Sequence, residues 1–164
     1  MAVRKLKLDG DSPEEITLVG LSSALKDYRL IHYLNKGLRI NFVRIPNLPY
    51  YITNTRMLSV PLYYYTHHIS EKNWFIFSNR SYSNEFVLPQ YKTLDFFLLI
   101  DDMPEQDATG GILRQLRNVK GIDLATNVDT NKVKKIDLLY ADLEMHLMEI
   151  YSDRTGESGL GRRI

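Results

Sequence analysis

The stretch Phe96-Phe97-Leu98-Leu99-Ile100 decides the fold, because five consecutive apolar residues are typical of a strand that is buried on both faces. Apolar residues then recur at helical spacing over 111–118, and a further strand is predicted over 122–128. With the helix that follows, the last part of the chain should run strand, helix, strand, helix. A crossover of this size resembles half of a split β-α-β unit, which gives this segment ferredoxin-like character.

The middle of the chain predicts an antiparallel hairpin. Every second residue over 58–64 is apolar and would share one face of a strand, and the apolar run 74–77 returns after a polar turn. Pro61 indicates either an edge position or a bulge, because proline cannot donate a ladder hydrogen bond. Shorter strands are expected at 4–8, 40–45 and 86–88.

The segment 15–20 has two interpretations. The preceding Ser12-Pro13-Glu14-Glu15 has the form of a capping box, which would begin a helix. The segment itself is rich in β-branched residues and ends at Gly20, and both features disfavour a helix. We therefore predict a strand over 15–20, followed by a helix that begins after Ser23 and is capped by Gly37.

These elements predict an α+β fold in which an antiparallel-dominated sheet carries helices on one side. The 164 residues suit one domain, expected to span 1–151, and the glycine-rich stretch over 152–164 predicts a disordered tail. The absence of cysteine excludes a disulfide scaffold and thiol catalysis and fits a reducing compartment. The start, Met1-Ala2-Val3-Arg4-Lys5, is followed by charge and by no apolar core, which argues against a signal peptide, and no apolar run approaches the roughly 18 residues of a spanning helix. We therefore expect a cytoplasmic protein that makes no contact with a membrane.

The final helix, predicted over 132–151, carries two apolar stripes on opposite faces. One stripe is enough to dock the helix on its own sheet; it consists of Ile136, Leu139, Tyr140, Leu143, Leu147 and Ile150. The second needs either a loop or the first helix of the same chain to cover it, or a partner, most simply in a symmetric dimer. Lysines at 132, 134 and 135 stand where the helix macrodipole disfavours cations, which helix stability does not explain. The predicted interface residues of the second stripe are Leu138, Ala141, Met145 and Met148.

The alternative function is the binding of RNA or of a nucleotide. Three cations of the first helix, Arg29, Lys36 and Arg39, could contact phosphates, and Tyr63 and Tyr65 of the hairpin could stack on bases. The simpler interpretation is a solvated helix face beside ordinary cross-strand packing. The overall charge argues against a general affinity for nucleic acid, because 21 Lys and Arg are balanced by 20 Asp and Glu.

The sequence offers little support for catalysis, and we predict no catalytic residue, no metal and no cofactor. The neighbours His67 and His68 would point to opposite faces of a strand, so they cannot easily share a metal. The acidic cluster that begins at Asp101 and Asp102 precedes a helix, where carboxylates cap free N–H groups. An enzyme or small-ligand domain would have to assemble its polar site from these four residues.

A family resemblance lies in Leu88-Pro89-Gln90-Tyr91-Lys92-Thr93-Leu94-Asp95-Phe96, which resembles the signature of the bacterial IPExxxVDY family. The stretch 20–30, with 34–36 after it, is similar to the N-terminal helix region of that family. The resemblance extends to about Val128. It implies a small, single-domain cytoplasmic protein of the kind typical of Bacteroidota, and it implies no activity.

The departures from the signature argue for a structural segment. Gln90 replaces the family's Glu and Phe96 its Tyr, so only Pro89 and Asp95 match the signature letters. Glutamine cannot act as a carboxylate base, and phenylalanine has no hydroxyl to donate. We expect Pro89 to end a strand and Asp95 to satisfy backbone donors in the turn that follows. The sequence thus predicts a non-catalytic interaction or dimerisation domain, with a homo-oligomer or another protein as partner.

Overall fold

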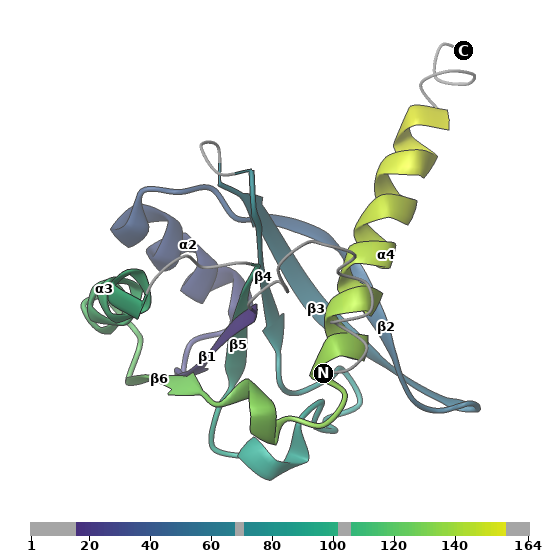
Figure 1. Ribbon diagram of the computed structural model, residues 1–164, viewed down its shortest axis with the longest axis horizontal. Helices are drawn as coiled ribbons and strands as arrows, with labels where there is room; N and C mark the ends of the chain where they lie inside the picture. The colour runs from purple at the N-terminus through teal and green to yellow at the C-terminus, as the bar shows by residue number, and fades with distance from the viewer. Residues whose placement is uncertain (1–15, 68–70, 102–105, 157–164) are drawn as a thin grey trace.

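Six antiparallel strands form one sheet in the order β2-β3-β4-β5-β1-β6 (Figure 1). The structure, a computed structural model, describes residues 16–67, 71–101 and 106–156, with the backbone alone at 106–110 and 153–156. The expected strand at 4–8 and the end of the chain from 157 lie outside the described residues. The strands are β1 (Ile16–Ser22), β2 (Val43–Thr53), β3 (Arg56–Thr66), β4 (Asn73–Ser78), β5 (Phe96–Asp101) and β6 (Leu124–Val128).

The strand β5 lies inside the sheet, as its apolar run predicts. All six of its residues are buried, and it pairs with β4 on one side and β1 on the other. The preference for a strand at 15–20 is confirmed, because β1 pairs with β5 along one edge and with β6 along the other. These antiparallel pairings make β5 and β6 parallel, with β1 between them. The ferredoxin-like character of the segment stays a prediction.

The hairpin between β3 and β4 is confirmed, and Pro61 lies at a bulge. Ile45 pairs with Leu62 and Leu48 with Val60, so β2 places two residues opposite this proline. The strand expected at 40–45 begins only at Val43 and continues to Thr53. The strand expected at 86–88 is wrong, because only an isolated bridge between Arg80 and Phe86 forms there.

Helices cover both faces of the sheet, so the prediction of helices on one side is wrong in that detail. The helices α2 (Asp27–Leu38) and α3 (Gln106–Arg117) share a core with Leu98 and Ile100 of β5. The helix α4 (Ile136–Gly156) packs on the opposite face, against Phe97 and Leu99 (Figure 1). The cause lies in β5, since a strand that is apolar on both sides needs a helical layer on each.

Two helix ends differ from expectation. α2 ends with Arg39 in the left-handed conformation, at φ 58° and ψ 49°, whereas the predicted cap Gly37 lies inside the helix. α4 continues to Gly156, so residues 152–156 are helical where a disordered tail was expected. No helix among the described residues is long and apolar enough to cross a membrane.

Candidate interaction surface

One stripe of α4 docks the helix on the sheet, as predicted. Leu139, Leu143 and Leu147 are buried in the core that α4 shares with the sheet. Tyr140 is buried beside them, and its hydroxyl donates a 2.6 Å hydrogen bond to Glu144 Oε2. Leu143 is fully enclosed, which marks the middle of the buried stripe and orients the whole helix.

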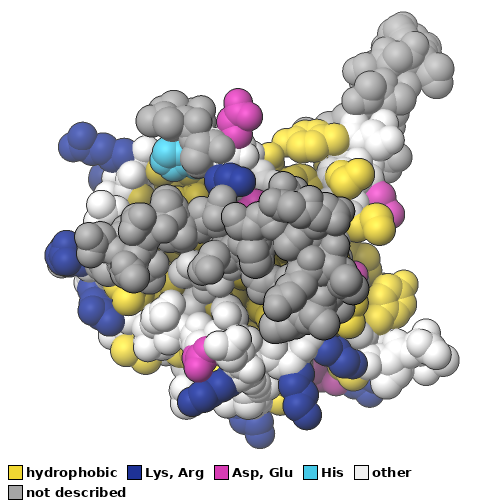
Figure 2. Space-filling view, viewed as in Figure 1, with side chains coloured by type: hydrophobic (Ala, Val, Ile, Leu, Met, Phe, Trp, Pro, Cys, Tyr) yellow, Lys and Arg dark blue, Asp and Glu magenta, His cyan; other side chains and the backbone are white. Residues whose placement is uncertain are grey.

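The second stripe of α4 faces solvent. Leu138 and Met145 are each 58% exposed, Met148 is 66% exposed, and Ala141 is exposed as well. α2 lies on the other face of the sheet, and no described segment of the chain buries these side chains. Figure 2 shows hydrophobic side chains gathered along α4 and the adjoining end of β2. The first helix of the same chain therefore does not cover this stripe, and no loop among the described residues does so either.

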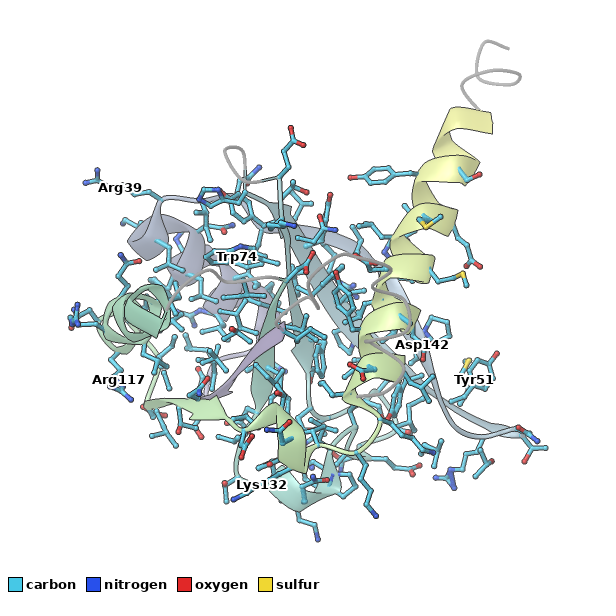
Figure 3. All side chains as sticks on the ribbon, viewed as in Figure 1. Arg39, Tyr51, Trp74, Arg117, Lys132 and Asp142 are labelled. Carbon is cyan, nitrogen blue, oxygen red and sulfur yellow. The ribbon has the colours of Figure 1, made fainter. Side chains whose placement is uncertain are left out.

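A groove of about 300 Å³ continues this surface at the N-terminal end of α4. It lies between the first turns of α4, the end of β2 and residues 86–89. Figure 3 labels Tyr51 and Asp142, which line it from β2 and from α4. Burial, followed by the charge of Asp142, raises the pKa of the Tyr50 phenol in the same wall. The lining is mostly apolar and includes Ile52, Val87, Pro89 and Leu138.

The groove was missed in the sequence because its walls come from three distant segments. Tyr51 and Ile52 lie in the part of β2 that the expected strand 40–45 did not reach. Both side chains are exposed, at 61% and 43%. The one sequence signal for Tyr51 and Ile52 was the pair Tyr50-Tyr51, because these two side chains would point to opposite faces if the strand continued past residue 45.

The segment that resembles the family signature has a structural role next to this groove. Asn79, fully buried, donates hydrogen bonds of 3.0 Å to the carbonyls of Tyr91 and Leu94 and accepts one of 2.7 Å from Leu88 N–H. Asp95 Oδ2 accepts a 2.9 Å hydrogen bond from Ser23 N–H. Pro89 does not end a strand; it begins a short 3-10 turn, Pro89–Tyr91. Nothing in the sequence analysis indicated Asn79.

The aromatic half of the predicted nucleic-acid site is wrong at Tyr63. This side chain is buried, and its hydroxyl donates a 2.9 Å hydrogen bond to Asp27 Oδ2. Burial, helped by that hydrogen bond, raises the pKa of the Tyr63 phenol above its usual value. Tyr65 is half-buried and packs edge-on against Trp74, with ring centroids 5.7 Å apart. Tyr63 thus has no free face on which a base could stack.

The basic half of that site is larger than the sequence analysis indicated. Arg29, Lys36 and Arg39 are exposed, and α2 contacts α3, which brings further cations alongside. The ranges 24–40 and 111–123 hold two acids, Asp27 and Asp123. Figure 3 labels Arg39 and Arg117 on this side of the molecule. The two ranges hold seven cations: Lys26, Arg29, Lys36, Arg39, Arg114, Arg117 and Lys120.

Two cations of this layer, Arg29 and Lys120, act on the side chain of Tyr33. A hydrogen bond from Arg29, together with the charge of Lys120, lowers the pKa of its phenol. The ammonium of Lys120 lies 5.2 Å from the centroid of the same ring. Cations of α2 and of the turn after α3 therefore act on one point of the surface.

The residues considered for catalysis are only partly brought together. His67 stacks on Trp74, which packs on the α2 side of the sheet, whereas Asp101 lies beside Tyr140 on the α4 side. His68 and Asp102 lie outside the described residues. Asp101 is buried beside Tyr140. Burial, followed by the hydrogen bonds to Glu144 and Asp101, raises the Tyr140 phenol pKa well above 10, so this group stays a proton donor. Within the described ranges, no cluster of three His, Asp or Glu residues could hold a metal ion.

No protein-family model, curated protein or solved structure matches this chain. The resemblance to the IPExxxVDY family therefore stays a prediction.

Proposed function

We propose that this protein is a non-catalytic interaction domain whose docking surface is the exposed stripe of α4 together with the adjoining groove. One observation carries the proposal. Leu138, Met145 and Met148 are 58–66% exposed on a helix whose opposite face is buried. Single exposed apolar residues are ordinary, but a row of them that runs into an apolar groove is typical of a protein-binding surface.

Burial of the exposed stripe against a partner would be energetically favourable. Removing one large apolar side chain from water contributes up to about 1.5–3 kcal/mol, and several side chains would be removed together. Methionine suits such a contact, because its unbranched side chain adapts to irregular neighbours. The clustering of Met145 and Met148 beside Leu138 is the pattern expected of an interface centre.

Sedimentation velocity of the full chain over a wide concentration range tests this proposal. We expect a concentration-dependent dimer that Met145→Lys abolishes without lowering the thermal midpoint, because this side chain is mostly in water. Tyr28→Lys is the matched control: Tyr28 is a 61% exposed helical residue on the opposite layer, and its replacement should leave the dimer intact. A chain that stays monomeric at every concentration contradicts self-association.

The layer of α2 and α3 supports a second candidate function, the binding of RNA through its phosphates. Over 24–40 and 111–123, seven Lys and Arg residues stand against two acids, and Asp107 is a further acid within α3. The overall charge of +1 does not show this local excess of positive charge. The test is the binding of a single-stranded RNA oligonucleotide as salt is varied. Arg29→Glu should weaken binding and flatten its salt dependence, and Lys134→Glu, in the turn before α4, is the control. Binding that ignores salt, or that both variants reduce equally, contradicts this candidate.

A further inference from the structure

We infer that the partner is a second copy of this chain, bound with its α4 antiparallel to the first. Met148 of each copy would then lie against Leu138 and the groove of the other. This inference rests on the proposed function, since it identifies the occupant of the same surface. Three features of α4 support it independently: the spacing of the stripe, the position of the groove and the distribution of charge.

The stripe is symmetric about residue 143. Leu138 and Met148 are each five residues from that point, and Ala141 and Met145 are each two residues from it. A two-fold axis there places the small Ala141 opposite the large Met145 of the second copy. A parallel pair would instead place Ala141 opposite Ala141, which leaves a gap, and Met145 opposite Met145, which crowds the next layer.

The groove and the projecting end of α4 stand at opposite ends of the same helix. The groove adjoins Leu138 near the N-terminal end, whereas the last turns of α4 extend past the body of the sheet (Figure 1). Met148, the most exposed of the large side chains of the stripe, lies toward that projecting end. Antiparallel pairing brings each projecting end over the groove of the other copy, and a parallel pair leaves both grooves unfilled.

One pair of opposite charges fits this geometry, while the other exposed charged side chains that the structure describes on α4, Asp137 and Asp142, are acidic. Lys134 and Lys135 are exposed in the turn just before α4, which begins at Ile136 and not at the predicted 132. Glu149 is exposed fourteen residues after Lys135. That separation is about 21 Å within one helix, so Lys135 and Glu149 of the same copy cannot pair. Antiparallel pairing brings Lys135 near Glu149 of the second copy, twice per dimer, and opposes the two macrodipoles favourably. It also accounts for lysines at a helix start that helix stability alone disfavours.

Disulfide trapping tests the relative orientation of the two α4 helices. The chain contains no native cysteine, so every cross-link must come from the introduced cysteines. Leu138→Cys and Met148→Cys chains of different lengths would be mixed under reducing conditions and then oxidised. A disulfide needs Cα atoms within about 7 Å. Like positions in the antiparallel dimer are offset by about 15 Å along the helix, whereas unlike positions face each other. We therefore expect cross-links between the two variants, several-fold above the background of Tyr28→Cys, and none within either variant alone.

Each outcome is decisive. Cross-links within Leu138→Cys alone or Met148→Cys alone indicate parallel helices and overturn this inference, while the interaction domain stands. A dimer that sediments normally but gives no cross-link above the Tyr28→Cys background also overturns it. A chain that never dimerises overturns the inference together with self-association.

A charge exchange provides an independent readout. Lys135→Glu should weaken the dimer several-fold by placing it beside Glu149 of the second copy, and adding Glu149→Lys should restore the affinity. The two substitutions cannot compensate within one chain, because their sites are too far apart on the helix. Additive weakening in the double variant would contradict the antiparallel pairing.

Discussion

Leu94 lies directly over Gly20, so close that a Cβ atom on residue 20 would stand 2.3 Å from Leu94 Cδ1. Gly20 belongs to β1 and pairs with Phe97 and Thr126, so its backbone cannot move aside without loss of two ladders. Leu94 is buried in turn. The missing side chain of Gly20 therefore allows the loop before β5 to pack on the sheet, and that loop supplies one wall of the groove.

Gly20→Ala should destabilise the fold by overpacking, by about 1–3 kcal/mol in urea unfolding. The added methyl group meets a buried leucine rather than solvent. Leu94→Ala alone should cost about 2–5 kcal/mol through the cavity that it leaves. The double variant should cost less than the sum, because the two changes relieve each other. Strict additivity would show that Leu94 does not occupy this position.

Asn79→Ala should lower the unfolding free energy by about 3 kcal/mol or more, because one buried amide and two carbonyls lose their partner. This corresponds to a fall of roughly 10 °C in thermal midpoint for a chain of this size. Asn127→Ala, at an exposed strand position, is the control and should stay within about 0.5 kcal/mol. The loop that Asn79 holds includes Val87 and Pro89 of the groove, so dimer affinity should fall as well. A stable Asn79→Ala chain would contradict its role as an anchor.

The sequence predicted those parts of the fold that depend on the spacing of apolar residues within a single helix or strand. The unbroken run of β5 and the two stripes of α4 each follow from spacing within one element. Spacing identifies which side chains of α4 are buried, but it contains nothing about which face of the sheet receives them. That information lies in the pairing of β5 with β1 and β4, which is non-local, and so the second helical layer was missed.

The same limit applies to the candidate site. Leu138 and the two methionines were found because one helix carries them, whereas the groove needs Tyr51, Val87 and Leu138 from three segments. In the sequence, Asn79 resembles an ordinary turn residue, because the carbonyl groups that it binds lie up to fifteen residues later in the chain. Tyr63 was assigned to the wrong environment because strand alternation could not tell the α2 side of the sheet from solvent.

Tyr140→Phe should destabilise the protein at neutral pH by about 1–3 kcal/mol, because Glu144 loses a buried donor. The folded-state pKa of this phenol is raised above the usual value of 10, so its stabilising effect is fully present below pH 10. Above pH 10 the unfolded chain loses the proton first, and wild-type stability falls more steeply than that of the variant. Urea unfolding at several alkaline pH values measures how the difference in unfolding free energy between the wild type and Tyr140→Phe narrows as the pH rises. Tyr51→Phe, at an exposed site, should match the wild type throughout, and a constant gap for Tyr140→Phe would refute the raised pKa.

Arg39→Gly should stabilise the protein by about 0.5–1 kcal/mol, because Arg39 adopts a left-handed conformation that only glycine reaches without strain. Lys36→Gly is a matched control. It removes the same charge and gains the same residue three positions earlier, but inside α2, where glycine costs about 1 kcal/mol. The two variants should therefore change the thermal midpoint in opposite directions. If RNA binds to the layer of α2 and α3, both should weaken it alike, because binding depends on the lost cation. A destabilised Arg39→Gly would mean that contacts of the arginine side chain outweigh the backbone strain at this helix end.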